Sequence, residues 1–420
     1  MSAGPPTEAA AGATRGVEPT RAGPVRFVYD PSLAAYELSP EHPFRPERLE
    51  LTRTLLEAVG ALPDEAYAPI AHVTERELAR VHSTRYIDAV KHASQGQVED
   101  EAYSYGLGTG DNPVFPDMHE AVLRVCGGTV SAVELVASGA ARRAVNLSGG
   151  LHHALRAKAS GFCVYNDLAL GIRRAVDGYG LRVAYIDLDV HHGDGVQWLF
   201  YDSPDVMTIS LHESGRYLFP GTGHTYETGR GPGRGASVNM PLEPFTEDAS
   251  FLEVFEIVVP RAIEAFRPDL IVLQAGADMH RNDPLADLSL SLAAMGASYR
   301  RVVELSERFT GGRLVATGGG GYDPYRTAPR AWSLLWAALN GRELPERVPE
   351  SWRARWAPRS PVELPQLMVD DPSSWPQIPR RATVSSHNRA VATRLMDVLE
   401  TIWTGRRAPA HGVEDREDTG

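Results

Sequence analysis

The chain has 420 residues, of which 43% are hydrophobic and 23% are charged, with a formal net charge of −12. This is the composition of a soluble globular protein, and the negative charge argues against general binding of nucleic acid, which needs a basic surface. No run of about 18 apolar residues occurs, so the sequence predicts no membrane span. Two cysteines, Cys126 and Cys163, are too few for a disulfide framework and favour a cytoplasmic location.

Predicted strands and helices alternate along the chain after residues 1–24, an Ala-, Gly- and Pro-rich stretch that we expect to be a disordered leader. Strands are predicted at 25–29, 144–147, 182–186, 206–211, 270–273 and 313–316. Helices are predicted at 46–59, 117–138, 168–176, 251–266 and 292–309. Strands separated by helices indicate right-handed crossovers and a mainly parallel sheet.

The C-terminal part has a different pattern. Residues 341–381 are rich in proline and predict an extended surface segment, residues 384–403 predict a terminal helix, and residues 404–420 predict a mobile tail. Because no linker interrupts residues 25–340, which hold the motifs, we expect one domain over residues 25–403.

Polar or glycine-rich segments follow five of the predicted strands. They are His152 and His153 after two glycines, Asp187 and Asp189, Ser210 with Leu211 and His212, Asp278 after Gly-Ala, and four glycines before Tyr322. In open α/β sheets, ligands bind at the carboxyl ends of the strands. The five segments therefore predict one site at one edge of the sheet.

The densest of these segments reads Asp-Leu-Asp-Val-His-His-Gly-Asp over residues 187–194. A catalytic zinc typically has three protein ligands and one open position. Asp189 and His191 supply two candidate ligands, and Asp278, after another strand, supplies the third. Any one of these side chains alone is better explained as a helix cap, but the carboxylates together need a positive counter-charge.

The paired histidines predict acid/base chemistry beside that metal. A histidine near a metal-bound water can act as general base and then as general acid, and a carboxylate fixes its tautomer. Asp187 and Asp194 remain once Asp189 is assigned to the metal, so His152 and His153 can form two His–Asp pairs.

The glycine run at 318–321 lacks the Lys-Ser/Thr of a P-loop and the spacing of a dinucleotide fingerprint. A tight turn that presents Tyr322 is the better interpretation. Tyr322 can then donate a hydrogen bond to a developing oxyanion.

These motifs together resemble the zinc-dependent deacetylases of the arginase/histone-deacetylase fold, and among them the bacterial acetoin-utilisation (AcuC-like) deacetylases. The matching runs, in family order, are 149–153, 159–167, 186–194, 219–223, 276–278 and 318–322. The resemblance implies an α/β fold with an eight-stranded, mainly parallel sheet and helices on both faces. It also implies zinc, or iron(II) in the cell, on Asp189, His191 and Asp278.

The resemblance further assigns roles to individual residues. It implies that His153, paired with Asp194, is the main general acid/base and that His152, paired with Asp187, is an electrostatic helper, although the residues themselves leave open which histidine dominates. The residues implied to bind substrate or to lie behind the site are Phe162 and Phe219 as tunnel walls, Leu285 at the rim, Asp111 on the substrate backbone, Gly161, Gly320, and Arg48 in an inner cavity.

Two structural potassium sites are also implied. The first would use Asp187, Asp189, His191, Ser210 and Leu211, and the second would use backbone oxygens at Phe200, Ser203 and Val206.

The implied reaction is zinc-dependent hydrolysis of acetyl groups, with other short acyl groups as candidates, from lysine side chains in proteins. Acetyl-CoA synthetase is one candidate partner. An acetylpolyamine amidohydrolase is the nearest alternative, although Leu285 does not supply the acidic rim residue that would favour it. A two-manganese ureohydrolase would need a second set of carboxylates, and a non-catalytic acetyl-lysine binder should lack a ligand or the acid/base pair. The target, the acyl preference, the native metal and the oligomeric state stay open.

Overall fold

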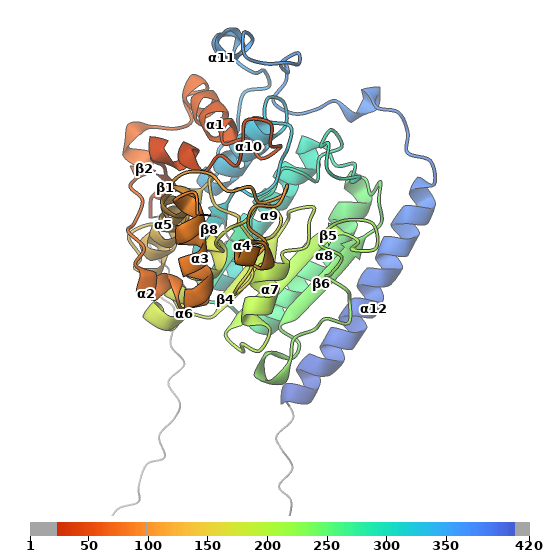
Figure 1. The fold of residues 1–420 in the computed structure, drawn as a ribbon. Coiled ribbons are helices and arrows are strands. Elements are labelled where there is room, and N and C mark those ends of the chain that lie inside the picture. The colour runs from red at the N-terminus through yellow and green to blue at the C-terminus, as the bar shows by residue number, and fades with distance from the viewer. Residues whose placement is uncertain (1–22, 98–99, 408–420) are drawn as a thin grey trace, which may run out of the picture.

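The computed structural model describes residues 23–97 and 100–407 and contains one eight-stranded sheet (Figure 1). The strand order is β2-β1-β3-β8-β7-β4-β5-β6, and every neighbouring pair is parallel. The strands are β1 (Val25–Val28), β2 (Tyr67–Ala68), β3 (Arg143–Asn146), β4 (Val183–Asp187), β5 (Val206–Glu213), β6 (Ser237–Leu242), β7 (Leu270–Gln274) and β8 (Leu314–Thr317). The predicted fold class is confirmed, with a sheet that is wholly parallel.

Helices cover both faces of the sheet. They are α1 (Glu47–Ala58), α2 (Glu75–Leu78), α3 (Thr84–Ser94), α4 (Asp100–Ser104), α5 (Met118–Ala137), α6 (Asp167–Tyr179), α7 (Asp194–Phe200), α8 (Asp248–Phe266), α9 (Leu292–Thr310), α10 (Ala328–Asn340), α11 (Glu350–Trp356) and α12 (Arg381–Arg407). Short 3₁₀ turns are η1 (Pro31–Ala35), η2 (Asp64–Ala66), η3 (Gly231–Gly233) and η4 (Pro372–Ser374). Helices α5, α6 and α7 pack on one face, and α1, α10, α9, α8 and α12 form a row on the other.

Local signals explain where the long helices begin and end. The side chains of Asn166 and Ser291 accept hydrogen bonds from the first turns of α6 and α9. Gly180 and Gly311 adopt positive φ angles of 64° and 63° where these helices end, a conformation that glycine adopts without strain.

The sequence did not predict β2, β6 or the helices α2, α3, α4, α7, α10 and α11. Strand β2 has only two residues, and β6 contains Pro241, which weakens a strand signal. Helix α10 carries buried residues around most of its surface, including Trp332 and Trp336.

The segment 341–381 is not simply an extended surface segment. It contains α11, whose Trp352 and Trp356 are buried against α1 in a small second hydrophobic cluster. Trp352 Nε1 donates to the Leu51 carbonyl at 3.0 Å, and Trp356 Nε1 donates to Thr54 Oγ1 at 3.0 Å. The proline-rich composition of the segment favoured an extended prediction and gave no sign that these two tryptophans are buried.

The segment is also fixed by an ion pair near its end. Asp370 accepts hydrogen bonds from His280 at 2.9 Å and from the Leu292 backbone at 3.0 Å, and it pairs with Arg330 at 3.0 Å. These contacts hold the chain against the start of α9 before it enters α12.

Other predictions fall on the chain ends and the cysteines. The predicted leader and tail lie almost wholly outside the described residues. Cys126 and Cys163 are both buried and unpaired. Among the helices of the described ranges, none has the length and apolar character that crossing a membrane requires.

Candidate metal centre

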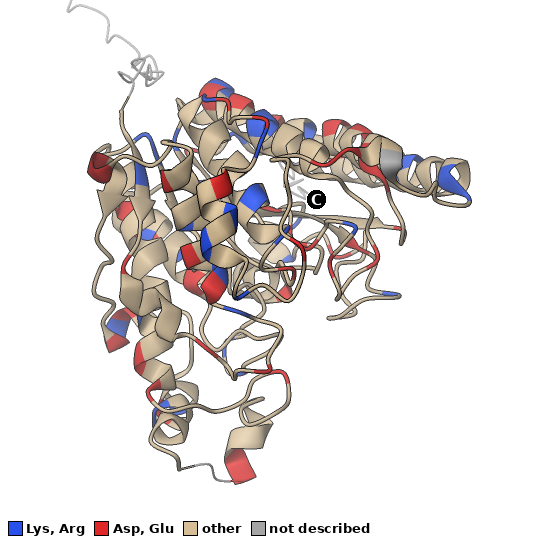
Figure 2. Ribbon diagram, turned by 90° about the horizontal axis from the view of Figure 1, so that it is seen from above, with Lys and Arg blue, Asp and Glu red and all other residues tan. Residues whose placement is uncertain are grey.

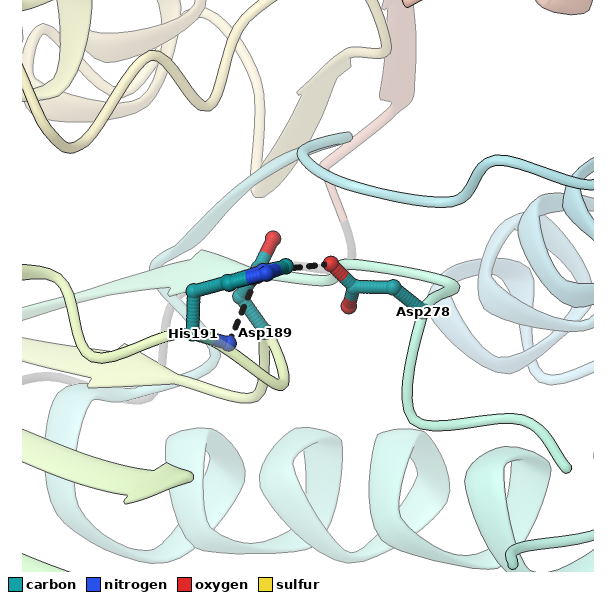
Figure 3. Close-up of side chains that lie close together, drawn as sticks. All are labelled: Asp189, His191 and Asp278. Atoms are coloured by element: carbon teal, nitrogen blue, oxygen red, sulfur yellow. Dashed lines mark hydrogen bonds and ion pairs between the residues drawn. The ribbon is translucent and has the colours of Figure 1, made fainter. Parts of the chain in front are cut away.

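Three side chains converge at the carboxyl edge of the sheet, as predicted (Figure 3). Asp189, His191 and Asp278 are all buried, and one ligand atom from each lies within 4.8 Å of the others. His191 Nδ1 lies 3.1 Å from Asp189 Oδ1 and 3.1 Å from Asp278 Oδ2.

The sheet order explains this convergence. Strands β4 and β7 are neighbours, with Asp187 opposite Gln274 at their carboxyl ends. The chain continues from β4 to Asp189 and His191 and from β7 to Asp278, so residues far apart in the sequence enter one space. The adjacency of these two strands is the tertiary fact on which the site depends.

Hydrogen bonds hold the two carboxylates in a fixed orientation. Asp189 Oδ2 accepts from Gln274 Nε2 and from the Gly320 backbone N–H, both at 2.7 Å. Asp278 Oδ1 accepts from the Val190 N–H at 2.9 Å. The other oxygen of each carboxylate faces His191. Outer hydrogen bonds of this kind orient metal ligands in known sites.

The donor set fits a divalent metal. Zinc bound tetrahedrally at about 2.0–2.2 Å has ligand atoms roughly 3.3–3.6 Å apart, close to the 3.1 Å between His191 Nδ1 and each facing carboxylate oxygen. Two carboxylates and one imidazole also suit iron(II).

The electrostatics of the cluster favour a bound cation. Burial opposes a charge on His191, yet Asp189 and Asp278 outweigh it and raise the pKa of His191 to about 10. Burial and the nearby Asp189 raise the pKa of Asp278 well above its usual value. In the absence of a metal, the cluster therefore retains protons that a metal ion would replace.

The glycine turn packs directly against the ligands. A Cβ atom on Gly320 would lie 1.8 Å from Asp278 Oδ2 and 3.0 Å from Asp189 Oδ2. Arg48, buried beneath the turn, donates to the carbonyls of Gly319 at 3.0 Å and Gly321 at 2.9 Å. The turn thus approaches the site as closely as a backbone can, which a side chain would prevent.

Both predicted His–Asp pairs are present in the structure. His152 Nδ1 lies 2.9 Å from Asp187 Oδ2, and His153 Nδ1 lies 2.8 Å from Asp194 Oδ1. The two Nε2 atoms are 3.0 Å apart, so only one of them can carry a proton in that gap.

The two histidines differ in charge because their surroundings differ. Burial and the neighbouring His152 lower the pKa of His153 to about 4. For His152, the carboxylates of Asp187 and Asp189 outweigh the opposing effect of burial and raise its pKa to about 9. In the absence of a metal, the pair therefore carries one positive charge, on His152, and His153 is neutral.

Aromatic rings flank the two histidines and Tyr322. The Phe162 ring lies 5.7 Å from the Tyr322 ring, and the Phe219 ring lies 5.0 Å from the His153 ring. A Cβ atom on Gly161 would lie 2.4 Å from the His153 ring, so glycine is required there. Phe219 is 43% exposed, which places this wall at the mouth of the site.

Asp283 is a residue of the site that the sequence did not reveal. It is buried, and its two oxygens accept from the backbone N–H groups of Tyr322 at 2.7 Å and Leu285 at 3.0 Å. It thereby joins the predicted oxyanion donor to the predicted rim residue. Burial raises its pKa to about 7. The Asp-Pro dipeptide at this turn was the available signal.

His192, which follows the metal ligand His191, supports the loop that carries Phe219. Its Nδ1 lies 2.8 Å from Thr222 Oγ1, and its Nε2 lies 3.2 Å from Gln197 Oε1. Gln197 in turn donates to Glu227 at 2.7 Å, which closes a buried network behind the loop.

The other predicted residues are placed less distinctively. Asp111 is exposed on the loop between α4 and α5. In the first predicted potassium site, Asp187 lies opposite Ser210 on the neighbouring strand. In the second, the Phe200 carbonyl accepts from the Ser203 N–H at 2.9 Å, and Val206 begins β5. Both potassium sites stay predictions.

Comparison with known proteins identifies a matching family and similar sequences. Residues 42–339 match the histone deacetylase domain family. The acetoin utilization protein AcuC of Bacillus subtilis is 44% identical over 376 residues, which cover 89% of this chain and 97% of that protein. AcuC of Staphylococcus xylosus is 40% identical over 380 residues, covering 89% and 98%.

Two solved structures of histone deacetylase homologs have a fold similar to that of this chain. A histone deacetylase homolog from Aquifex aeolicus superposes with a TM-score of 0.77 at 31% identity, covering 87% of this chain and 99% of that one. A histone deacetylase homolog complexed with SAHA superposes with a TM-score of 0.78 at 31% identity, covering 88% and 100%.

Proposed function

The chain belongs to the histone deacetylase family, and from that premise we propose that it is a metal-dependent hydrolase that removes acetyl groups from lysine side chains of proteins. The observation that carries the proposal is the convergence of Asp189, His191 and Asp278 beside two His–Asp pairs. A metal site without an acid/base would bind an acyl group, whereas this combination can also hydrolyse it.

Asp189, His191 and Asp278 would hold the metal, with zinc as the first candidate and iron(II) as the second. When bound, such a metal supplies Lewis-acid polarisation of the amide carbonyl and lowers the pKa of a bound water. Potassium at the two predicted sites would have a structural role.

His153 is the residue placed to move the proton. With Asp189 committed to a metal, the extra proton on His152 is less favoured, and His153 Nε2 would then accept a proton from the attacking water, while Asp194 holds its Nδ1–H and stabilises the resulting imidazolium. It then returns that proton to the lysine nitrogen, so that free lysine and acetate leave. His152 would hold its Nδ1 proton on Asp187 and act as an electrostatic helper.

Tyr322 would stabilise the tetrahedral intermediate by donating a hydrogen bond from its hydroxyl to the oxyanion. Asp283 holds the backbone N–H of Tyr322 and therefore its position. Phe162 and Phe219 would enclose the methylene chain of the acyl-lysine and exclude water from the reacting carbonyl, with Leu285 and Asp111 at the rim and Gly161 and Gly320 leaving the necessary space.

The test compares substrates on one metal-quantified preparation. We expect turnover of a capped acetyl-lysine peptide and inhibition by SAHA, the compound held by one of the matched structures. Faster turnover of acetylspermidine than of the peptide would support a polyamine amidohydrolase instead. Binding of the peptide without release of acetate would indicate a non-catalytic binder. A series of longer acyl groups then measures the acyl preference.

Protein targets and location follow from weaker arguments. Relatives carry the name acetoin utilization protein, so acetylated metabolic enzymes, with acetyl-CoA synthetase first, are the substrates to test. A cytoplasmic location fits the two buried, unpaired cysteines.

A further inference from the structure

A groove lies between α12 and the loop that follows β5. Its volume is about 430 Å³. Leu395, Val391 and Val398 supply apolar side chains from α12, while residues 214–226 supply the opposite wall. The family match ends at residue 339, so α12 lies beyond the matched residues.

The charged residues of the groove are mainly basic. Arg216 comes from the loop, and Arg394 comes from α12. Both are exposed, and neither forms an ion pair with another residue in the part of the chain that the structure describes. The one acidic side chain lining the groove, Glu243, lies 3.4 Å from His387.

The charge of this groove differs in sign from that of the whole chain. The chain carries a net charge of −12, and acidic and basic residues are interspersed along its helices (Figure 2). Two exposed arginines that form no ion pair within the described residues line one groove here, and they favour a negatively charged occupant.

The loop that lines the groove also carries Phe219, which lies beside His153 in the proposed active site. Arg216 is three residues from Phe219, so their Cα atoms lie within about 11 Å of each other. Phe219 lies beside His153 and would form one wall of the opening through which an acyl-lysine enters. Towards the other end of the same loop, the His224 ring stacks on the exposed Tyr226 ring, with their centroids 5.0 Å apart. The buried network of His192, Gln197 and Glu227 fixes the loop between them.

We propose that this groove binds the stretch of substrate protein next to the acetylated lysine and selects stretches that carry Asp or Glu. An extended segment advances about 3.3 Å per residue, so three to five residues span about 10–16 Å, which is enough to bring a carboxylate from the acetyl-lysine to Arg216. Arg394 lines the same groove as Arg216. The inference rests on the proposed deacetylase function and adds to it the class of protein substrate.

The test uses two acetyl-lysine peptides that are identical except at the third to fifth positions on each side, which are Glu in one and Lys in the other. An exposed arginine–carboxylate contact changes binding by about two- to fivefold. With two such contacts, we expect the wild-type kcat/KM to favour the acidic peptide by roughly 4- to 25-fold. The preference should shrink in 0.5 M salt, because exposed charges are screened.

Arg394→Glu supplies the decisive variant. It should lower kcat/KM for the acidic peptide and raise it for the basic peptide, a reversal that misfolding cannot produce. Arg342→Glu is the matched control, since it makes the same charge change on an exposed residue just after α10. That end of α10 lies near the amino-terminal ends of the strands, away from the carboxyl ends that hold the site. There the Leu339 carbonyl accepts a hydrogen bond from Arg143 at the start of β3.

The outcomes separate the two proposals. If the wild-type protein fails to hydrolyse a short capped acetyl-lysine, the proposed function itself is wrong. If it hydrolyses that substrate but treats both peptides alike, only the groove proposal is overturned. The groove proposal is also overturned if Arg394→Glu slows hydrolysis of both peptides equally, or if Arg342→Glu changes the ratio of the two kcat/KM values as much as Arg394→Glu does. A change of oligomeric state in Arg394→Glu would overturn it too, because it would indicate a second copy of the chain in the groove.

Discussion

Replacing Gly320 by alanine tests the close packing of the glycine turn against the metal ligands. The added Cβ atom would lie 1.8 Å from Asp278 Oδ2, whereas Cβ contacts below 3.0 Å essentially do not occur. The Asp278 carboxylate would have to retreat by about 1.2 Å, and a misplacement of about 1 Å at a reacting centre can cost 10²-fold in rate. The carboxylate cannot retreat freely, because its other oxygen is held by the Val190 N–H.

We therefore expect Gly320→Ala to weaken zinc binding at least about 100-fold, which is about 2.8 kcal/mol, and to lose activity to a similar degree. The assays are metal content per chain after purification and zinc affinity by competition with a chelator. Gly296→Ala is the control, since its Cβ would meet its nearest neighbour at an ordinary 3.5 Å within α9. Full metal occupancy with near-native turnover in Gly320→Ala would refute the reasoning.

Three further predictions concern the ligand set, the oxyanion donor and the C-terminal extension. Asp278→Ala should lose the metal, because two donors remain; metal analysis showing a full site would contradict that assignment. Tyr322→Phe should keep the metal and lose about 10²–10³-fold in kcat on an acetyl-lysine peptide, and near-native turnover would count against its role. Asp370→Asn should reduce the free energy of unfolding by about 3 kcal/mol near pH 7, measured by denaturant titration, because it leaves the buried Arg330 unpaired. Although burial opposes the charge on Asp370, His280 and Arg330 lower its pKa, so the charged Asp370 stabilises the fold above about pH 4. The difference in the free energy of unfolding between wild type and Asp370→Asn should therefore narrow as the pH falls below that value, and a constant difference would contradict this.

The sequence predicted most of the sheet because its central strands are short, continuous apolar runs. The predicted starts and ends of β4, β7 and β8 agree with the structure to within one residue. Strand β6 escaped this criterion because it alternates polar and apolar residues and contains a proline. Its place in the sheet depends on pairing with β5, which no local pattern records.

The candidate ligands were predictable because each follows directly from the end of a strand. Their spatial neighbours were not. Gln274 ends β7 as one more polar residue, and only the adjacency of β4 and β7 shows that it holds Asp189. Asp283 was missed for the same reason, since its partner Tyr322 is 39 residues away in the sequence. The groove likewise depends on the packing of α12 beside a loop more than 150 residues earlier.

The position of α12 also has a consequence for how the chain folds during synthesis. Strand β6 ends the sheet, and α12 lies alongside it (Figure 1), with Asn388 accepting from the Glu243 N–H at 3.0 Å and Trp403 donating to the Gly235 carbonyl at 2.8 Å. At about 5–20 residues per second, a ribosome needs roughly 10–30 s to pass from Leu242 to Arg407. Until α12 has been synthesised, the outer edge of β6 lacks this cover, and an uncovered strand edge is one at which another chain can pair.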